Sequence, residues 1–119
     1  MTVFLPYSVL MSVYARESAA FLTMSLNSMM AQSIPPQEIV LVEDGLITSE
    51  LNESITNFDE AYPGLLTVVS YSKNQGLGYA LSRGLPVCRN EIVARMDSDD
   101  YAFPPRMEEQ LSLMEERDL

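Results

Sequence analysis

The stretch EIVLVEDG, residues 38–45, decides the fold of this chain. Four apolar residues in a row, three of them β-branched, are typical of a buried strand. The run ends directly in Glu43, Asp44 and Gly45. These two carboxylates have two interpretations: an acidic turn before a helix, or acceptors for the N–H and O–H groups of a base or ribose.

Apolar periodicity on both sides of this strand predicts that strands and helices alternate along the chain. Leu22, Leu26, Met29 and Met30, for example, follow the spacing of one helix face. The predicted strands are residues 7–14, 38–45, 65–71 and 91–96, and the predicted helices are residues 17–32, 51–58, 77–85 and a last helix with Pro104 or Pro105 in its first turn. This order predicts an α/β fold, with an open, mainly parallel sheet and helices on both faces.

Length and composition indicate one globular domain. The chain has 119 residues, of which 47% are hydrophobic, enough for one core. The chain has seventeen acidic and seven basic residues. This balance argues against nucleic acid as a partner, because nucleic acid is negatively charged and binds basic surfaces. One cysteine and no histidine leave no internal disulfide and no zinc ligand set. We expect a single domain over residues 1–119 in a reducing, cytoplasmic setting.

Polar residues follow three of the predicted strands. They are Glu43–Asp44 after the second strand, Lys73–Asn74 after the third, and Asp97, Asp99 and Asp100 after the fourth. Because the carboxyl ends of parallel strands meet at one edge of a sheet, where ligands bind, we expect these residues to lie close together.

The carboxylates after the fourth strand predict a partner of positive charge. Three carboxylates within four residues repel one another unless a cation lies among them. An Asp-x-Asp pair suits Mg²⁺ or Mn²⁺, with a diphosphate completing the ligand shell. The alternative is a solvated acidic loop, or acids that interact with the dipole of the last helix.

The segment KNQGLGYALSRG, residues 73–84, contains a glycine pair that invites comparison with dinucleotide-binding loops. Leu81 stands where the third small residue of that fingerprint belongs, and the segment follows the third strand rather than the first. We therefore expect the glycines to let the backbone turn tightly into a helix and approach a ligand closely.

Four segments, taken in order, resemble family 2 glycosyltransferases, whose members have the GT-A nucleotide-sugar-binding fold. The segments are SVLMSVYARESAAFLTMSLNSMMAQS, EIVLVEDG, KNQGLGYALSRG and ARMDSDDYAFPPRM, and together they span nearly the whole chain. The resemblance implies transfer of a sugar, with inversion and with the help of Mn²⁺ or Mg²⁺, from a nucleotide-diphosphate donor, with UDP-sugars favoured. It implies a saccharide or lipid-linked acceptor in surface polysaccharide or lipopolysaccharide synthesis, at the inner face of the membrane.

The resemblance also implies roles for individual residues. Asp44 matches the acid that meets the uracil or nucleoside, and Asn74, Gly76 and Ala80 match an N-x-G-x-x-x-A element. The residues implied to bind the donor are Ser12, Val13, Tyr14, Glu17, Asp44, Lys73, Asn74, Gly76, Arg83, Asp97 and Ser98. The residues implied to hold the metal are Asp97, Asp99 and Asp100.

Enzymes of this family normally continue for about another hundred residues or more, roughly one further domain. The resemblance implies that this further part carries acceptor recognition and the catalytic base, so we expect the base beyond residue 119. We expect the chain to be the donor-binding portion, weakly active or inactive alone, with an exposed sheet edge that permits homo-oligomers. The alternatives are a non-catalytic nucleotide-binding fragment and a receiver-like signalling domain.

Overall fold

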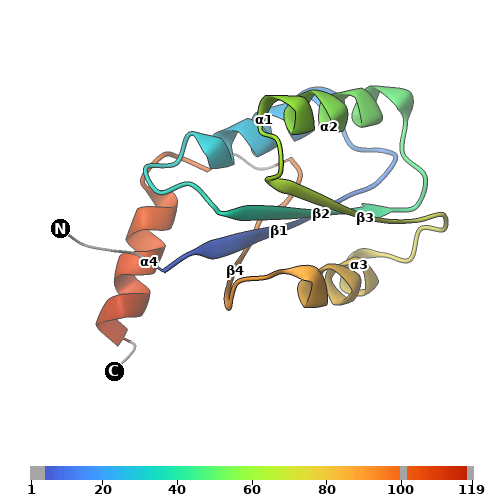
Figure 1. Cartoon of the computed structure of the whole chain (residues 1–119). Helices are drawn as coiled ribbons and strands as arrows, with labels where there is room; N and C mark the ends of the chain where they lie inside the picture. Colours follow the sequence, from blue (N-terminus) through green and yellow to red (C-terminus); the bar gives the residue numbers. More distant parts are fainter. Residues whose placement is uncertain (1–4, 100–101, 118–119) are drawn as a thin grey trace.

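The computed structural model of the chain describes residues 5–99 and 102–117, in which strands and helices alternate (Figure 1). The elements are β1 (Tyr7–Val13), α1 (Ala19–Met30), β2 (Glu38–Asp44), α2 (Ser49–Ala61), β3 (Leu66–Tyr71), α3 (Leu77–Gly84), a 3-10 turn η1 (Leu85–Val87), β4 (Ile92–Arg95) and α4 (Arg106–Arg117). The predicted order of elements is confirmed, with ends that differ by a few residues.

The four strands form one sheet in the order β3-β2-β1-β4, and every neighbouring pair is parallel. In this register Met11 lies opposite Leu41, and Asp44 at the end of β2 lies opposite Tyr71 at the end of β3. The predicted open parallel sheet is confirmed. Among the described strands, β4 is an edge strand, so the edge expected to permit homo-oligomers is present and the association itself stays a prediction.

Helices cover both faces of the sheet, as predicted: α1 and α2 lie on one face and α3 on the other (Figure 1). Alternate residues of β1 and β2 therefore enter two different cores. The smaller core, against α3, contains Leu10, Val40, Val42 and Ala80. The larger core contains Tyr7, Val9, Met11, Val13, Leu22, Leu26, Met29, Ile39, Leu41, Leu51, Ile55, Phe58, Met96, Ala102, Met107 and Leu111.

Side chains at the helix starts explain where α1 and α2 begin. The Ser18 hydroxyl accepts a hydrogen bond from the Phe21 N–H at 3.3 Å, and the Thr48 hydroxyl accepts one from the Leu51 N–H at 3.2 Å. Each bond satisfies an N–H group that has no partner inside the helix. These caps fix the first turns of α1 and α2, two of the helices that contribute side chains to the larger core.

The start of α4 differs slightly from the prediction. The helix begins at Arg106, and the carbonyl of Pro105 accepts the first helical hydrogen bond, from the Glu109 N–H at 2.9 Å. The two prolines therefore precede the first turn rather than occupy it. A proline at this boundary loses nothing, because its missing N–H would have had no partner within the helix.

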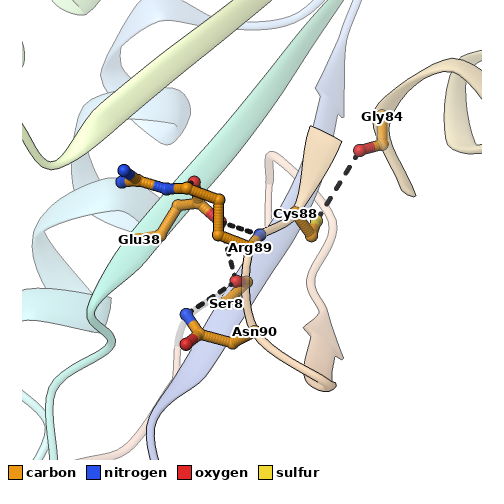
Figure 2. A network of polar contacts seen from close by, with 6 residues as sticks. All are labelled: Ser8, Glu38, Gly84, Cys88, Arg89 and Asn90. Atoms are coloured by element: carbon orange, nitrogen blue, oxygen red, sulfur yellow. Dashed lines mark hydrogen bonds and ion pairs between the residues drawn. The ribbon is translucent and has the colours of Figure 1, made fainter. Parts of the chain in front are cut away.

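A polar network lies at the amino ends of β1 and β2 (Figure 2), whereas Asp44 lies at the carboxyl end of β2. The Glu38 carboxylate is buried, accepts hydrogen bonds from the Ser8 hydroxyl and the Arg89 backbone N–H at 2.8 Å each, and pairs with the Arg89 guanidinium at 2.8 Å. Asn90 completes the network by donating to the Ser8 hydroxyl at 3.0 Å. Burial raises the pKa of Glu38, but the Ser8 hydroxyl and the Arg89 groups outweigh the effect of burial and leave the pKa lowered. The network ties the segment before β4 to both central strands.

Candidate functional site

A cleft of about 300 Å³ lies at the carboxyl ends of the strands, the edge at which the sequence predicts a ligand. This volume is at the lower end of the range for small-molecule sites. The cleft is lined by Ser12, Val13, Tyr14, Glu17, Asp44, Asn74, Gly76, Leu77, Asp97, Ser98 and Asp99. The fold thus gathers every described residue of the predicted site except Lys73 and Arg83; the roles of the gathered residues stay predictions.

Asp44 is held in the cleft by three hydrogen bonds. Its Oδ1 accepts hydrogen bonds from the Tyr71 hydroxyl at 2.6 Å and the Gln75 N–H at 2.8 Å, and its Oδ2 accepts one from the Gly76 N–H at 3.0 Å. Burial raises the pKa of Asp44, but the three donors outweigh burial and lower it, so the group is ionised at neutral pH. The carboxylate therefore lies at the N-terminus of α3, where a negative charge is stabilised.

Glycines allow this contact between β2 and the start of α3. Gly45 has a φ of +91°, and a Cβ atom on it would lie 2.9 Å from the Asn74 backbone nitrogen. Gly76 has a φ of +94° and turns the chain into α3. Asn74 closes the turn by donating from its side chain to the Asp44 carbonyl at 3.2 Å. The expected tight glycine turn is therefore present.

Asp97 and Asp99 are exposed and face the same cleft, on either side of the buried Ser98. Asp97 forms a long ion pair with Arg95, with 3.9 Å between Arg95 Nη2 and Asp97 Oδ1. Because both side chains are exposed, this ion pair adds little to stability. Within residues 5–99 and 102–117, no three acidic, cysteine or histidine side chains are close enough together to hold a metal ion. Asp100, the third predicted ligand, lies outside the described residues. Two carboxylates still fit Mg²⁺ or Mn²⁺, which bind through one or two carboxylates plus phosphate oxygens and water.

Helix α1 holds the segment that carries these carboxylates, through two buried serines. The Ser25 hydroxyl donates to the Asp97 carbonyl at 3.1 Å, and the Ser28 hydroxyl accepts from the Ala102 N–H at 3.1 Å. Both serines are buried, although the sequence predicted only an apolar inner face for this helix. Their spacing of three residues beside the apolar face is the signal that could have found them.

Gln32, just beyond α1, extends this hold towards α4. Its side-chain amide nitrogen donates to the carbonyls of Ala102 at 2.9 Å and Phe103 at 2.8 Å. Its amide oxygen accepts from the Met107 N–H at 2.9 Å. Gln32 is buried, so these bonds are shielded from water and fix the position of the chain that follows the carboxylates.

Three residues near the cleft differ from the expected arrangement. Lys73 is exposed and does not line the cleft. The Arg83 guanidinium lies 5.4 Å from the centre of the Tyr71 ring, also outside the lining, so its approach to a donor stays a prediction. Leu77, which the sequence did not indicate, lines the cleft with 46% of its surface exposed. Its place directly after Gly76, at the start of α3, was the available signal.

Comparison with known proteins gives a family match that spans almost the whole chain. The model of the family "Glycosyl transferase family 2" matches residues 8–119. The amylovoran biosynthesis glycosyltransferase AmsE of Erwinia amylovora is 42% identical over 109 residues, which are 92% of this chain and 40% of that protein. The UDP-Gal:alpha-D-GlcNAc-diphosphoundecaprenol beta-1,3-galactosyltransferase of Escherichia coli is 38% identical over 104 residues, 86% of this chain and 36% of that protein.

Solved structures show the same fold. TarS 1–349 of S. aureus in complex with UDP-GlcNAc has a TM-score of 0.80 and 25% identity over 95% of this chain and 32% of that chain. The mannosyltransferase PcManGT of Pyrobaculum calidifontis, in complex with GDP-Man and Mn²⁺, has a TM-score of 0.77 and 24% identity over 94% of this chain and 32% of that chain. The chain spans about 40% of the length of the curated relatives that it matches. The family match and the shared GT-A fold together show that this chain belongs to glycosyltransferase family 2.

Proposed function

We propose that this chain forms the donor-binding part of a glycosyltransferase that transfers a sugar from a UDP-sugar to a saccharide or lipid-linked acceptor. The observation that carries the proposal is the single cleft that joins Asp44 to the Asp97–Asp99 pair. The relatives named for amylovoran biosynthesis and for galactosyl transfer from UDP-Gal support a role in surface polysaccharide synthesis. Family membership argues against the receiver-like alternative.

The cleft offers one group for each end of a nucleotide diphosphate. Asp44 accepts a hydrogen bond from an N–H group of the base, and the backbone around Ser12 and Tyr14 lies against the nucleoside. Asp97 and Asp99 would hold Mn²⁺ or Mg²⁺, and such an ion neutralises charge on a departing diphosphate. The distribution of these groups over three strand ends supports a ligand that extends across the edge of the sheet.

The acceptor side of the reaction needs a further group. In an inverting transfer, a carboxylate deprotonates the acceptor hydroxyl on the face of the sugar opposite the leaving group. As the resemblance to the family implies, we place this base outside residues 1–119, in the part of the relatives that this chain does not cover. We place the reaction in the cytoplasm at the inner face of the membrane, where a lipid-linked acceptor would lie. Among the described residues, no helix is both long and apolar enough to cross a bilayer.

Isothermal titration calorimetry with UDP tests the proposal on the chain as it stands. We expect binding that requires Mn²⁺ and that falls at least about tenfold in Asp99→Asn, because one metal ligand is lost. The control is Asp59→Asn, which removes an equal charge from the exposed surface of α2 and leaves the cleft intact. UDP affinity that is the same without Mn²⁺, or the same in both variants, would contradict the proposed metal-diphosphate site.

A further inference from the structure

The hydrogen bonds to Asp44 leave its carboxylate with little capacity for a ligand. An ionised carboxylate has roughly four acceptor positions, about two on each oxygen. Tyr71 and Gln75 fill those of Oδ1, whereas Oδ2 accepts only from Gly76 within the described residues. As far as the described residues occupy this carboxylate, one acceptor position, on Oδ2, remains for a group in the cleft.

A single acceptor position distinguishes between nucleobases. The pairing edge of uracil presents one N–H between two carbonyl oxygens, and one acceptor satisfies it. The pairing edge of guanine presents two neighbouring N–H groups, which pair with both oxygens of a free carboxylate in the way that arginine does. With Oδ1 of Asp44 filled, the second guanine N–H would be desolvated without a partner.

Tyr71 is the side chain that fills Oδ1, and its surroundings hold it there. The Tyr79 ring packs edge-on against it, with 5.2 Å between centroids and 88° between planes. The Arg83 guanidinium lies 5.4 Å from the Tyr71 ring centre and donates to the Tyr79 hydroxyl at 3.0 Å. Burial and then the bond to Asp44 raise the pKa of Tyr71, so its hydroxyl stays protonated and remains a donor.

We propose that Tyr71 is a specificity-determining positioning residue: its hydroxyl occupies Oδ1 of Asp44, limits this carboxylate to one further donor, and so favours uridine over guanosine diphosphate. This inference rests on the proposed function of the cleft. It assigns a role to a residue that lies outside the cleft lining and acts through Asp44.

The first test compares UDP and GDP affinities, with Mn²⁺, for the wild-type chain and Tyr71→Phe. Removing the hydroxyl opens a position on Oδ1, so we expect GDP to gain relative to UDP and the preference for UDP to fall by about fivefold, the effect of one hydrogen bond. The matched control is Tyr79→Phe, which removes a hydroxyl of the same aromatic cluster that does not contact Asp44, and should leave the preference unchanged. If folded Tyr71→Phe has the same preference for UDP over GDP as the wild-type chain, the inference is overturned. UDP binding by the wild-type chain in that experiment would still support the proposed function.

The second test needs no variant and so does not depend on how Tyr71→Phe folds. Inosine diphosphate lacks the amino group that supplies the second N–H of guanine. If Asp44 offers one acceptor position, the wild-type chain binds inosine diphosphate at least as tightly as GDP. GDP binding about tenfold tighter would show that both oxygens are available, which overturns the inference. Failure of the wild-type chain to bind any of the three nucleotides would instead refute the proposed function, and this inference with it.

Discussion

Replacing Gln32 with methionine removes the side-chain hydrogen bonds between the end of α1 and the segment that leads into α4. Methionine has a similar length and shape, so the change removes polar contacts without opening a large cavity. The Gln32 amide nitrogen has two hydrogens, which are shared among the carbonyls of Ala102, Phe103 and Ser28. The Gln32 amide oxygen accepts a third hydrogen, from one backbone N–H group. At about 1 kcal/mol for each of these three hydrogen atoms, the free energy of unfolding should fall by about 3 kcal/mol.

Urea unfolding followed by circular dichroism measures this change. For an m value of about 1.5 kcal/mol/M, a loss of about 3 kcal/mol lowers the midpoint by about 2 M. The control is Gln110→Met on the exposed surface of α4, which should change stability by less than about 0.5 kcal/mol. A loss below about 1 kcal/mol in Gln32→Met, with m unchanged, would refute the idea that these buried bonds hold the segment after Asp99.

Two further predictions concern stability. The pKa values of Glu38 and Asp44 are lowered in the folded chain, so at acidic pH the folded chain binds fewer protons than the unfolded chain. The stability that these two carboxylates add is therefore fully present above their pKa in the unfolded chain. It is lost as the pH falls through their pKa in the folded chain. The urea midpoint should therefore be lower at pH 4 than at pH 7, and Glu43, whose pKa burial raises, offsets part of the loss. An equal midpoint at both pH values would contradict the expected loss of stability. In Gly84→Ala, the new Cβ would lie 2.5 Å from the Leu10 side chain and 2.7 Å from the Val42 side chain, so thermal unfolding should show a loss of about 1–3 kcal/mol. An unchanged Tm would contradict the expected clash between α3 and the sheet.

Most of the fold could be predicted from the sequence, because its signals are local. In α2, Leu51, Ile55 and Phe58 follow the helical period, and all three are buried. The apolar run of β2 likewise predicts a strand covered on both faces, and its residues divide between the two cores. Periodicity reports which side of an element faces a core, and this is enough to order strands and helices into a parallel sheet.

The polar contacts that shape the site could not be predicted in the same way. Ser25 and Gln32 are buried in α1 and just after it, and their partners lie about 70 residues further along the chain. A buried polar residue is acceptable only where its partner is in place, and one sequence does not show where that partner is. The Asp97–Asp99 pair was therefore predictable as a motif, whereas the helix that holds it in position was not.

Asp44 shows how structure and recognition share one carboxylate. Gly45 lets the end of β2 approach the Asn74 backbone so closely that any other residue would collide with it. This approach brings the Asp44 carboxylate to the N–H groups of Gln75 and Gly76, where it stabilises the start of α3. Acceptor positions used there cannot also bind a nucleotide. The chemistry left for recognition is therefore set by the contacts that hold the fold, and this is why a tyrosine outside the cleft should change which base the cleft prefers.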